Sequence, residues 1–463
     1  MARRPESTRG GGAGPARWRA FLALTSLERG RAERLRDALA VDDLDVRDRG
    51  LALELAMGTE RRRITIDAVL LAFAAQGVLP RDPFVRTAAR LGTAQLLYLP
   101  KIPPHAAVHG TVALLRAQQG FVNGILRRIA GAIEARVADP SRARAELALP
   151  AAADGGPRTL VLPRAGLPDP AANPAAALAV RHGLPEFLMG RWLEAFGSDE
   201  GMAIAAASAQ APGVTLRVNP TRGDAAGIIA ALAAEGVTVT AEPHPRLLRL
   251  GETQGISPFE TRAHARGLFS VQDPTALAAA EAVGARPGER ILDLCAAPGG
   301  KTTAMAEVMA GEGTVFAHDV SKVRLDRVRE AAARLGLTAV VTLAPTLADA
   351  PDRVDAVLVD VPCSNTGVLA RRVEVRRRLT PDALVELARR QVELTCLAVT
   401  RVRPGGRVVY STCSLEPEEN RSVVDAVLAT DPTLRLGLDR LTLPRAQQHD
   451  GGYFAVLIKA EDP

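Results

Sequence analysis

The chain has 463 residues, of which 47% are hydrophobic and 24% are charged, so it is long enough for several domains and apolar enough to bury a core. These values exclude a small disulfide-stapled scaffold and a wholly disordered chain. The formal net charge of +6 favours a polyanionic partner such as nucleic acid without proving one.

The chain starts with MARRPESTRGGGAG, whose basic charge is followed by an apolar stretch of about four residues, too short for a signal-peptide core. No run approaches the ~18 apolar residues of a membrane span. We therefore expect a cytoplasmic protein with reduced cysteines and no membrane partner. No C-x-x-C pair occurs, so we expect no metal site. The four cysteines are Cys295, Cys363, Cys396 and Cys413.

Two segments precede the region of strands. Residues 1–137 are predicted to form an all-helical domain, because apolar residues recur at helical spacing from Phe121 to Ile133 and suit core packing. Residues 138–184 carry seven prolines among alanines, which predicts a linker.

A small α/β module is predicted for 185–265, and a larger α/β domain for 266–463. In the larger domain strands and helices alternate, which indicates a doubly wound, mostly parallel sheet that binds ligands at the carboxyl ends of its strands. The module has predicted helices at 186–196 and 224–235 and strands at 214–219, 237–241 and 246–250. The domain has predicted strands at 289–295, 314–320, 339–344, 355–361, 406–413 and 453–460, with helices from about 302, at 322–335, near 381–402 and near 418–430.

A glycine-rich turn, DLCAAPGGKTT (293–303), follows the first of these strands and opens a helix, where backbone N–H groups bind nucleotide-like ligands. A phosphate-binding P-loop would need glycine five positions before Gly300, where this chain has Cys295, so that alternative fails. Asp319 ends the second strand, where a carboxylate accepts hydrogen bonds from ribose hydroxyls. Together they predict an adenosine-type cofactor.

Two cysteines follow two later strands. Cys363 lies in DVPCSNTG (360–367) and Cys413 in YSTCSLEPEEN (410–420), and both segments leave the sheet on the cofactor side. Cys396 stands among apolar residues of a helix and is predicted to be inert filler.

This set of residues suits methylation of a pyrimidine carbon. A thiolate that adds to C6 makes C5 nucleophilic toward a methyl group on a sulfonium donor. A second group must then remove the C5 proton so that the enzyme is released. A carboxylate at Asp360 can hydrogen-bond the N3 and N4 edge of cytosine while charge develops on the ring.

Together, DLCAAPGGKTT, DVPCSNTGVL and YSTCSLEPEEN resemble the motifs of the RNA cytosine-C5 methyltransferases of the RsmB/NOP (Fmu/Sun) family, in that family's order. The resemblance spans about 265–463 and implies a Rossmann-like class I methyltransferase domain that uses S-adenosylmethionine. By the same resemblance, Cys413 is the nucleophile, Cys363 assists product release and Asp360 acts in catalysis. The cofactor site implied comprises Cys295, Ala296, Ala297, Pro298, Gly299, Gly300, Lys301, Asp319 and Asp360.

Residues 17–137 resemble the helical NusB-type RNA-binding domain, in DRGLALELAMGTERRR (48–63), ARLGTAQLLYLPKIPPHAAVHGTV (89–112) and FVNGILRRI (121–129). That fusion implies the bacterial RsmB branch, which acts on small-subunit ribosomal RNA. LRVNP (216–220) and SVQDPTAL (270–277) match the family's small RNA-recognition-like region more loosely. We accordingly expect RNA as the partner and a monomeric protein.

Two stretches depart from the family's pattern. Pro345 stands where members carry an acidic residue that contacts adenine, and LARRVEVRRRL (369–379) replaces an Arg-His-Pro-Asp stretch followed by tryptophan. Basic clusters are expected to contact RNA phosphates instead of reading bases. These clusters are Arg61 to Arg63, Arg127 with Arg128, and Arg376 to Arg378.

Two alternatives stay open. One is an RNA-binding or antitermination-like factor with an inactive methyltransferase fold, which Pro345 favours and the intact cysteine pair disfavours. The other is a DNA cytosine methyltransferase, in which the nucleophile normally sits in the motif after the fourth strand. The position of Cys413 in the later motif favours RNA by resemblance.

Overall fold

The computed structural model describes residues 13–251, 253 and 255–461, so most of the basic start used in the signal-peptide argument lies outside the described residues. The chain divides into two compact units. The first runs to Ala211 and also includes Arg372–Arg377, and the second comprises the rest. None of the described helices is long and apolar enough to cross a membrane.

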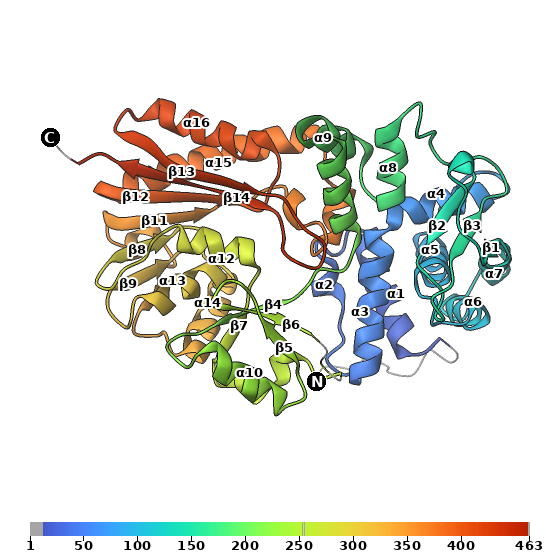
Figure 1. Ribbon diagram of the computed structural model, residues 1–463, viewed down its shortest axis with the longest axis horizontal. Coiled ribbons are helices and arrows are strands. Elements are labelled where there is room, and N and C mark those ends of the chain that lie inside the picture. Colours follow the sequence, from blue (N-terminus) through green and yellow to red (C-terminus); the bar gives the residue numbers. More distant parts are fainter. Residues whose placement is uncertain (1–12, 252, 254, 462–463) are drawn as a thin grey trace. The chain divides into compact units, whose positions relative to one another are not determined.

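The first unit begins with seven helices (Figure 1). Two of them start directly after Asp45 and Asp82, whose carboxylates accept hydrogen bonds from backbone N–H groups of the first turn. Apolar side chains from all seven meet in one core, which confirms the all-helical prediction for this region. The helices are α1 (Pro15–Glu28), α2 (Leu35–Ala38), α3 (Val46–Arg61), α4 (Arg63–Phe73), α5 (Pro83–Tyr98), α6 (Pro104–Val112) and α7 (Gln119–Gly131).

The predicted packing stripe of α7 is confirmed in its middle and wrong at its start. Val122, Ile125, Leu126 and Ile129 are at most 2% exposed, whereas Phe121 is 43% exposed. Phe121 lies in the first turn of the helix, and Ile133, the last residue of the predicted stripe, lies beyond the helix in a short strand, Ile133–Glu134.

The proline-rich stretch 138–184 contains regular structure, which differs from the expectation of a linker. Pro150 follows one strand and Pro157 precedes the next, so the missing N–H groups do not interrupt the antiparallel ladder. Pro174 opens a helix, where its N–H would be unpaired anyway. The elements from here to the end of this part are β1 (Ile133–Glu134), η1 (Pro140–Arg142), β2 (Glu146–Leu149), β3 (Arg158–Val161), α8 (Pro174–His182) and α9 (Glu186–Ala209).

The second unit begins with a small antiparallel sheet that packs on helices around its own apolar core. Its last strand, which starts at Phe269, was not predicted. The elements are β4 (Thr215–Val218), α10 (Ala225–Ala233), β5 (Val239–Ala241), β6 (Leu247–Leu250), η2 (Pro258–Glu260), α11 (Arg262–Ala265) and β7 (Phe269–Val271), and the strand order is β5-β6-β4-β7.

A seven-stranded sheet follows in the same unit. Its elements are α12 (Pro274–Glu281), β8 (Arg290–Asp293), α13 (Gly300–Val308), β9 (Thr314–Ala317), α14 (Lys322–Leu335), β10 (Val341–Leu343), η3 (Leu347–Asp349), β11 (Val354–Asp360), η4 (Thr366–Val368), α15 (Pro381–Arg401), β12 (Val402–Thr412), η6 (Pro417–Glu419), α16 (Arg421–Thr430), β13 (Leu434–Thr442) and β14 (Gly452–Lys459). The segment η5 (Val373–Arg377) belongs to the first unit.

The strand order is β10-β9-β8-β11-β12-β14-β13, and only the last two strands run antiparallel to their neighbours. Helices α15 and α16 cover one face, and α12, α13 and α14 cover the other (Figure 1). The predicted doubly wound, mostly parallel sheet is confirmed. Strand β13, with exposed residues along it, was not predicted.

Neighbouring residues of the central strands pack on opposite faces. Ile291 and Leu358 belong to the core under α12 to α14, while Leu292 and Val357 belong to the core under α15 and α16. Because both faces are covered, these strands are continuous apolar runs, which made them predictable.

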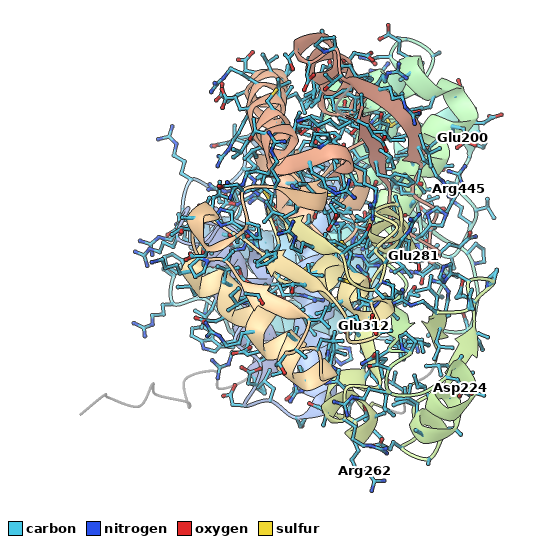
Figure 2. All side chains as sticks on the ribbon, turned by 90° about the vertical axis from the view of Figure 1, so that its left-hand side faces the viewer. Glu200, Asp224, Arg262, Glu281, Glu312 and Arg445 are labelled. Atoms are coloured by element: carbon cyan, nitrogen blue, oxygen red, sulfur yellow. The ribbon has the colours of Figure 1, made fainter. Side chains whose placement is uncertain are left out.

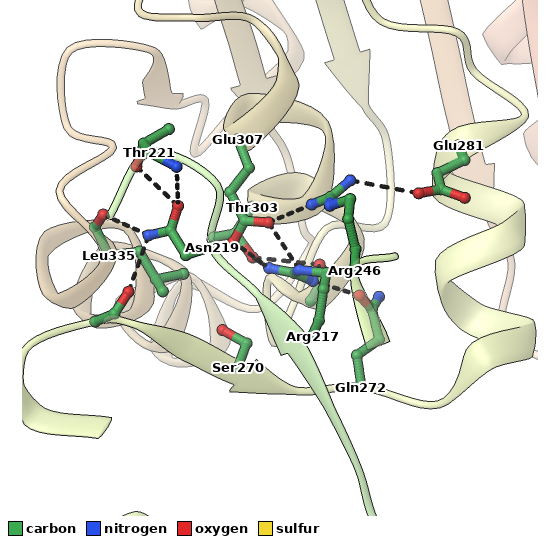
Figure 3. A network of polar contacts seen from close by, with 12 residues as sticks. Arg217, Asn219, Thr221, Arg246, Ser270, Gln272, Glu281, Thr303, Glu307 and Leu335 are labelled. Atoms are coloured by element: carbon green, nitrogen blue, oxygen red, sulfur yellow. Dashed lines mark hydrogen bonds and ion pairs between the residues drawn. The ribbon is translucent and has the colours of Figure 1, made fainter. Parts of the chain in front are cut away.

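A buried arginine of the small sheet joins it to the first helix of the large sheet (Figure 3). Arg217 of β4 is fully buried and pairs with Glu307 of α13 through two hydrogen bonds, of 2.7 and 2.9 Å. Its other donors reach the side chains of Gln272 and Thr303 and the carbonyl oxygen of Gly300, so all five guanidinium N–H groups have acceptors. The start of α13 is thereby fixed to the small sheet.

Candidate active site

The candidate site lies where the strand order of the large sheet reverses. β9 lies on one side of β8, while β11 lies on the other. Loops that leave β8 and β11 at their carboxyl ends therefore diverge, and ligands bind in the crevice between such loops. The glycine-rich turn follows β8 and the Cys363 segment follows β11.

The glycine-rich turn passes close to α14 before it enters α13. Gly299 has φ +103°, and a Cβ there would lie 3.2 Å from the Cα of Val328, so only glycine fits without strain. Helix α13 begins directly after it, and its free N–H groups face the turn. This geometry suits the close approach of a ligand to the main chain.

Two buried carboxylates stand at the ends of β8 and β9. Asp293 Oδ2 accepts a hydrogen bond from Thr302 Oγ1 at 2.7 Å, whereas Oδ1 has no partner among the described residues. Burial raises the pKa of Asp293 to about 7. Asp319 accepts hydrogen bonds from the backbone N–H groups of Ala297 (3.3 Å) and Ser321 (2.9 Å). Asp293 was not among the predicted site residues, although a carboxylate at a strand end in this motif was the available signal.

An ion pair joins the glycine-rich turn to the end of β11. The Nζ of Lys301 lies 2.7 Å from the Oδ2 of Asp360. Burial lowers the pKa of Lys301, but the neighbouring charges of Asp360 and Cys413 raise it more, so the pKa lies above its ordinary value. Lys301 is therefore a cation at neutral pH, close to Cys413.

The two predicted thiols meet. The Sγ atoms of Cys363 and Cys413 are 3.1 Å apart, because β11 and β12 are adjacent parallel strands in which Asp360 pairs with Ser411. Asn365, which sequence reasoning missed, lies with its Oδ1 3.4 Å from the Sγ of Cys413. Three positions from the two cysteine segments thus form one polar cluster.

The two cysteine segments approach each other at a glycine. The N–H of Gly367 donates to the carbonyl of Cys413 at 2.9 Å, and the N–H of Gly451 donates to the carbonyl of Gly367 at 2.8 Å. A Cβ on Gly367 would lie 2.5 Å from the carbonyl oxygen of Gly451. The same Cβ would lie 3.0 Å from the carbonyl oxygen of Cys413, so glycine lets the two segments approach this closely.

The environment keeps a proton on Cys363. Its hydrogen bond with Cys413, followed by burial, raises the pKa of Cys363 well above its ordinary value. Cys295 in the glycine-rich turn also stays a thiol, because burial and then nearby carboxylates raise its pKa to about 12. Cys396 lies in α15 with its Sγ 3.8 Å from the Oγ1 of Thr430.

A small cavity of about 50 Å³ borders the cysteine pair. Lys301 and Cys413 line it, together with Asp273, Asp450 and Tyr453. One or two water molecules fill such a volume at ~30 Å³ each, so a nucleobase needs side chains to move before it can enter.

Several arginines expected to contact phosphate are used inside the protein instead. In the first unit, Arg61 and Arg376 are 3% and 5% exposed, and Arg377 forms ion pairs with Glu28 and Glu60. Burial lowers the pKa of Arg376 to about 9. The prediction is wrong for Arg61 and Arg376 because they are buried, and for Arg377 because Glu28 and Glu60, far away in the sequence, pair with it.

The other arginines of the basic clusters fall into two groups, those with a partner inside the protein and those that are exposed. Arg63 lies 3.4 Å from the carboxylate of Glu60, and the guanidinium of Arg62 lies 4.4 Å from the ring centre of Tyr98. Arg127, Arg128 and Arg378 are exposed. Phosphate contacts therefore stay a prediction for those three arginines.

Three family models match consecutive parts of the chain. The 16S rRNA methyltransferase RsmB/F model matches residues 280–457, the NusB family model matches 15–131, and the RsmF/B-like ferredoxin-like domain model matches 184–257.

Solved structures share the fold. One titled "Crystal Structure of PH0851" covers 96% of this chain and 99% of its own, with a TM-score of 0.73 and 23% identity. The structure of NSun6 from Pyrococcus horikoshii with SFG covers 60% of this chain and 99% of its own, with a TM-score of 0.54 and 22% identity.

Curated relatives match over nearly the whole length. The probable ribosomal RNA small subunit methyltransferase B of Bacillus subtilis is 32% identical over 432 residues, which are 89% of this chain and 88% of the relative. The ribosomal RNA small subunit methyltransferase B of Pseudomonas putida is 32% identical over 444 residues, 90% of this chain and 92% of the relative. The chain thus belongs to the RsmB/F family of 16S rRNA methyltransferases, as its three motifs and its helical N-terminal domain predict.

Proposed function

We propose that this protein methylates C5 of a cytidine in small-subunit ribosomal RNA, with S-adenosylmethionine as the methyl donor. The observation that carries the proposal is the pair of thiols 3.1 Å apart at the ends of β11 and β12, beside the Lys301–Asp360 ion pair. The names of the relatives support ribosomal RNA as the substrate. Paired thiols beside a cation suit an unreactive pyrimidine carbon better than a nitrogen or oxygen, which needs no covalent activation.

The residues around the glycine-rich turn fit S-adenosylmethionine. The unpartnered Oδ1 of Asp293 is a buried acceptor that a ligand's amino group can satisfy. Asp319 is placed for ribose hydroxyls, as in dinucleotide folds. When bound, the cofactor supplies an electrophilic methyl group on a sulfonium sulfur.

Cys413 is the nucleophile in this proposal. Lys301 lines the same small cavity as Cys413, which places a cation beside the sulfur that attacks. The sulfur would form a bond to C6, and the electrons of the C5–C6 double bond would form the bond from C5 to the methyl carbon, whose bond to the sulfonium sulfur breaks and leaves a neutral thioether. Asp360 accepts a hydrogen bond from the exocyclic amine and holds the base.

Cys363 completes the reaction as the base. Once Cys413 is bonded to C6, the shared hydrogen bond that most raises the pKa of Cys363 is lost, so Cys363 ionises more readily. Its thiolate then takes the proton from C5, the electron pair re-forms the C5–C6 double bond, and Cys413 leaves as a thiolate.

We infer that the first unit binds RNA through the groove between α6 and α7. This groove has a volume of about 740 Å³. Apolar side chains such as Val108 and Val112 form part of its lining, and His105, His109 and Arg127 add hydrogen-bond donors. Arg128 is exposed on the same helix. Such a lining suits phosphate and sugar oxygens, which position an RNA strand without reading its sequence.

Methyl transfer from labelled S-adenosylmethionine to protein-free small-subunit rRNA tests the function. The expected result is label in 5-methylcytidine after nucleoside digestion, and none with Cys413→Ala. Cys363→Ala should trap a protein–RNA adduct on a denaturing gel, since C5 keeps its proton. Label in another nucleoside, or full activity of Cys413→Ala, would contradict the proposed chemistry.

The inactive-factor alternative draws on Pro345, and calorimetry decides it. Tight S-adenosylmethionine binding by the purified protein would exclude that alternative, whereas RNA binding with no cofactor binding would support it. Matched RNA and DNA oligonucleotides in the same transfer assay separate the DNA alternative.

A further inference from the structure

One buried carboxylate contacts both cysteine segments. Glu419, at the end of η6, is fully buried. Its carboxylate accepts four hydrogen bonds. Two come from Ser364, from its backbone N–H at 2.8 Å and from its hydroxyl. The other two come from the hydroxyl of Ser414 at 2.5 Å and from the Nε2 of Gln391 at 2.9 Å. All four of these donors are neutral, although a buried carboxylate is costly unless it is well solvated by the protein.

The two serines follow the two cysteines directly. Ser364 is next to Cys363 and Ser414 is next to Cys413. The serine Oγ atoms are 3.1 Å apart, as are the cysteine Sγ atoms. The two segments therefore run past each other as a matched pair, with the thiols on one side and the serine hydroxyls gathered on Glu419.

Glu419 is itself held from two other elements. Its carbonyl oxygen accepts a hydrogen bond from the hydroxyl of Tyr410 in β12 at 2.5 Å. Gln391 of α15 donates both to Glu419 and to the carbonyl of Pro362, the residue before Cys363, at 3.0 Å. Hydrogen bonds from β12 and α15 thus hold Glu419 in place relative to the sheet.

We propose that Glu419 is a positioning residue that sets the separation of Cys363 and Cys413. The inference rests on the proposed function and adds to it the group that arranges both thiols. An ionised carboxylate offers about four acceptor sites on two oxygens, which matches the four donors, whereas an amide offers two acceptor sites and adds two donors. Glu419→Gln keeps the shape and must break at least one of these hydrogen bonds.

The main experiment compares Glu419→Gln with wild type. We expect kcat for rRNA methylation to fall at least tenfold, with KM for RNA and for S-adenosylmethionine within threefold. We also expect more trapped protein–RNA adduct than in wild type, because a displaced Cys363 no longer reaches the C5 proton. The matched control is Glu312→Gln, in an exposed loop of the same unit (Figure 2), which should leave all these values unchanged.

Separate serine variants test the arrangement if Glu419→Gln folds poorly. Ser364→Ala should raise the adduct fraction, since it loosens the Cys363 segment, whereas Ser414→Ala should slow adduct formation. Unchanged kcat in Glu419→Gln, or identical behaviour of the two serine variants, would overturn the proposal.

A measurement without RNA or cofactor separates failure of this inference from failure of the proposed function. Diamide takes two electrons and two protons from a pair of adjacent thiols and leaves a disulfide, and mass spectrometry of the peptides quantifies the Cys363–Cys413 product. We expect the rate of that oxidation to fall at least threefold in Glu419→Gln. An unchanged rate would overturn the positioning role even if the wild-type protein methylated no RNA.

Discussion

Two buried charges of the second unit are held in different ways. Arg217 faces an opposite charge, Glu307, and uses all five donors where the small sheet meets α13. Glu419 is surrounded by neutral donors where the two cysteine segments meet. The first arrangement joins two layers of structure, and the second places two reactive atoms. The partners of a buried charge, more than its burial, indicate what it does.

The largest expected effect is on stability, at Arg217. Arg217→Met should lower the free energy of unfolding by about 3 kcal/mol, because it breaks a fully buried ion pair and leaves Glu307 with Arg246 as its remaining cationic partner. Urea denaturation of the purified protein measures this loss. At saturating cofactor, kcat should stay within about twofold, in contrast to Glu419→Gln.

The paired change Arg217→Met with Glu307→Met serves as the control for that prediction. It should restore most of the lost stability, since both members of the buried pair are gone and Arg246 keeps Glu281 as its partner at 3.4 Å. Arg262→Lys, at an exposed arginine of α11 (Figure 2), should have no effect. Equal losses in the single and double variants would mean that the ion pair is not what joins the two layers.

The next effect is expected where the cysteine segments touch. Gly367→Ala places a methyl group 2.5 Å from the carbonyl oxygen of Gly451 and 3.0 Å from that of Cys413, so the backbone around Gly367 must shift. Overpacking of this kind costs about 1–3 kcal/mol, and we expect methyl transfer to fall more than stability does. Steady-state kinetics beside a thermal melt measures both. Wild-type activity in this variant would show that the close contact is not needed.

A smaller effect is expected from pH on cofactor binding. Burial raises the pKa of Asp293 to about 7, so this carboxyl is protonated below pH 7 and ionised above it. When ionised, Asp293 can accept from Thr302 on one oxygen and from the ligand's amino group on the other. Affinity for S-adenosylmethionine should therefore rise about tenfold between pH 6 and 8. Calorimetry in two buffers should also detect proton release on binding. Asp293→Asn should bind with little pH dependence.

The linkage of Asp293 to folding has the opposite sign. Its pKa in the folded protein lies above the ordinary value of 3.8. The protonated form therefore favours folding at low pH, and that contribution is lost as pH rises through about 7. Asp293→Asn should remove this part of the pH dependence of unfolding.

The smallest effect is expected for an exposed charge. Arg127 lines the groove of the first unit, where its Nε donates to the Oδ1 of Asn123 at 3.1 Å. Arg127→Ala should weaken RNA binding by about two- to fivefold. The slope of log affinity against log salt concentration should fall by about the amount that one phosphate contact contributes. Filter binding at several salt concentrations tests this. No change in the salt slope would place the RNA elsewhere.

Sequence patterns predicted the parts of the site that follow from strand order. The meeting of Cys363 and Cys413 was predictable because adjacent parallel strands end at the same edge. Glu419 was not, since EPEEN offers three glutamates and only the packing of Ser364, Ser414 and Gln391 distinguishes one of them. Long-range partners decide such cases, and a single sequence does not display them.

The same limit explains the errors among the arginines and strands. Arg376 and Arg377 looked like a phosphate-binding cluster because their partners, among them Glu28 and Ser208, lie far away along the chain. β7 was missed because it is only three residues long and is defined by pairing with β4. Composition, likewise, could not show that prolines at 150 and 157 flank strands.

The short segment Arg372–Arg377 has a consequence for the order in which the protein is made. Residues up to Ala211 leave the ribosome first, but the first unit also includes this segment, more than 150 residues later. Val373 joins the core of the helical part, and Arg377 neutralises Glu28 and Glu60 there. The N-terminal part therefore reaches its final form only after most of the methyltransferase sheet has been synthesised, and a cut between the two stretches of sequence does not yield two complete units.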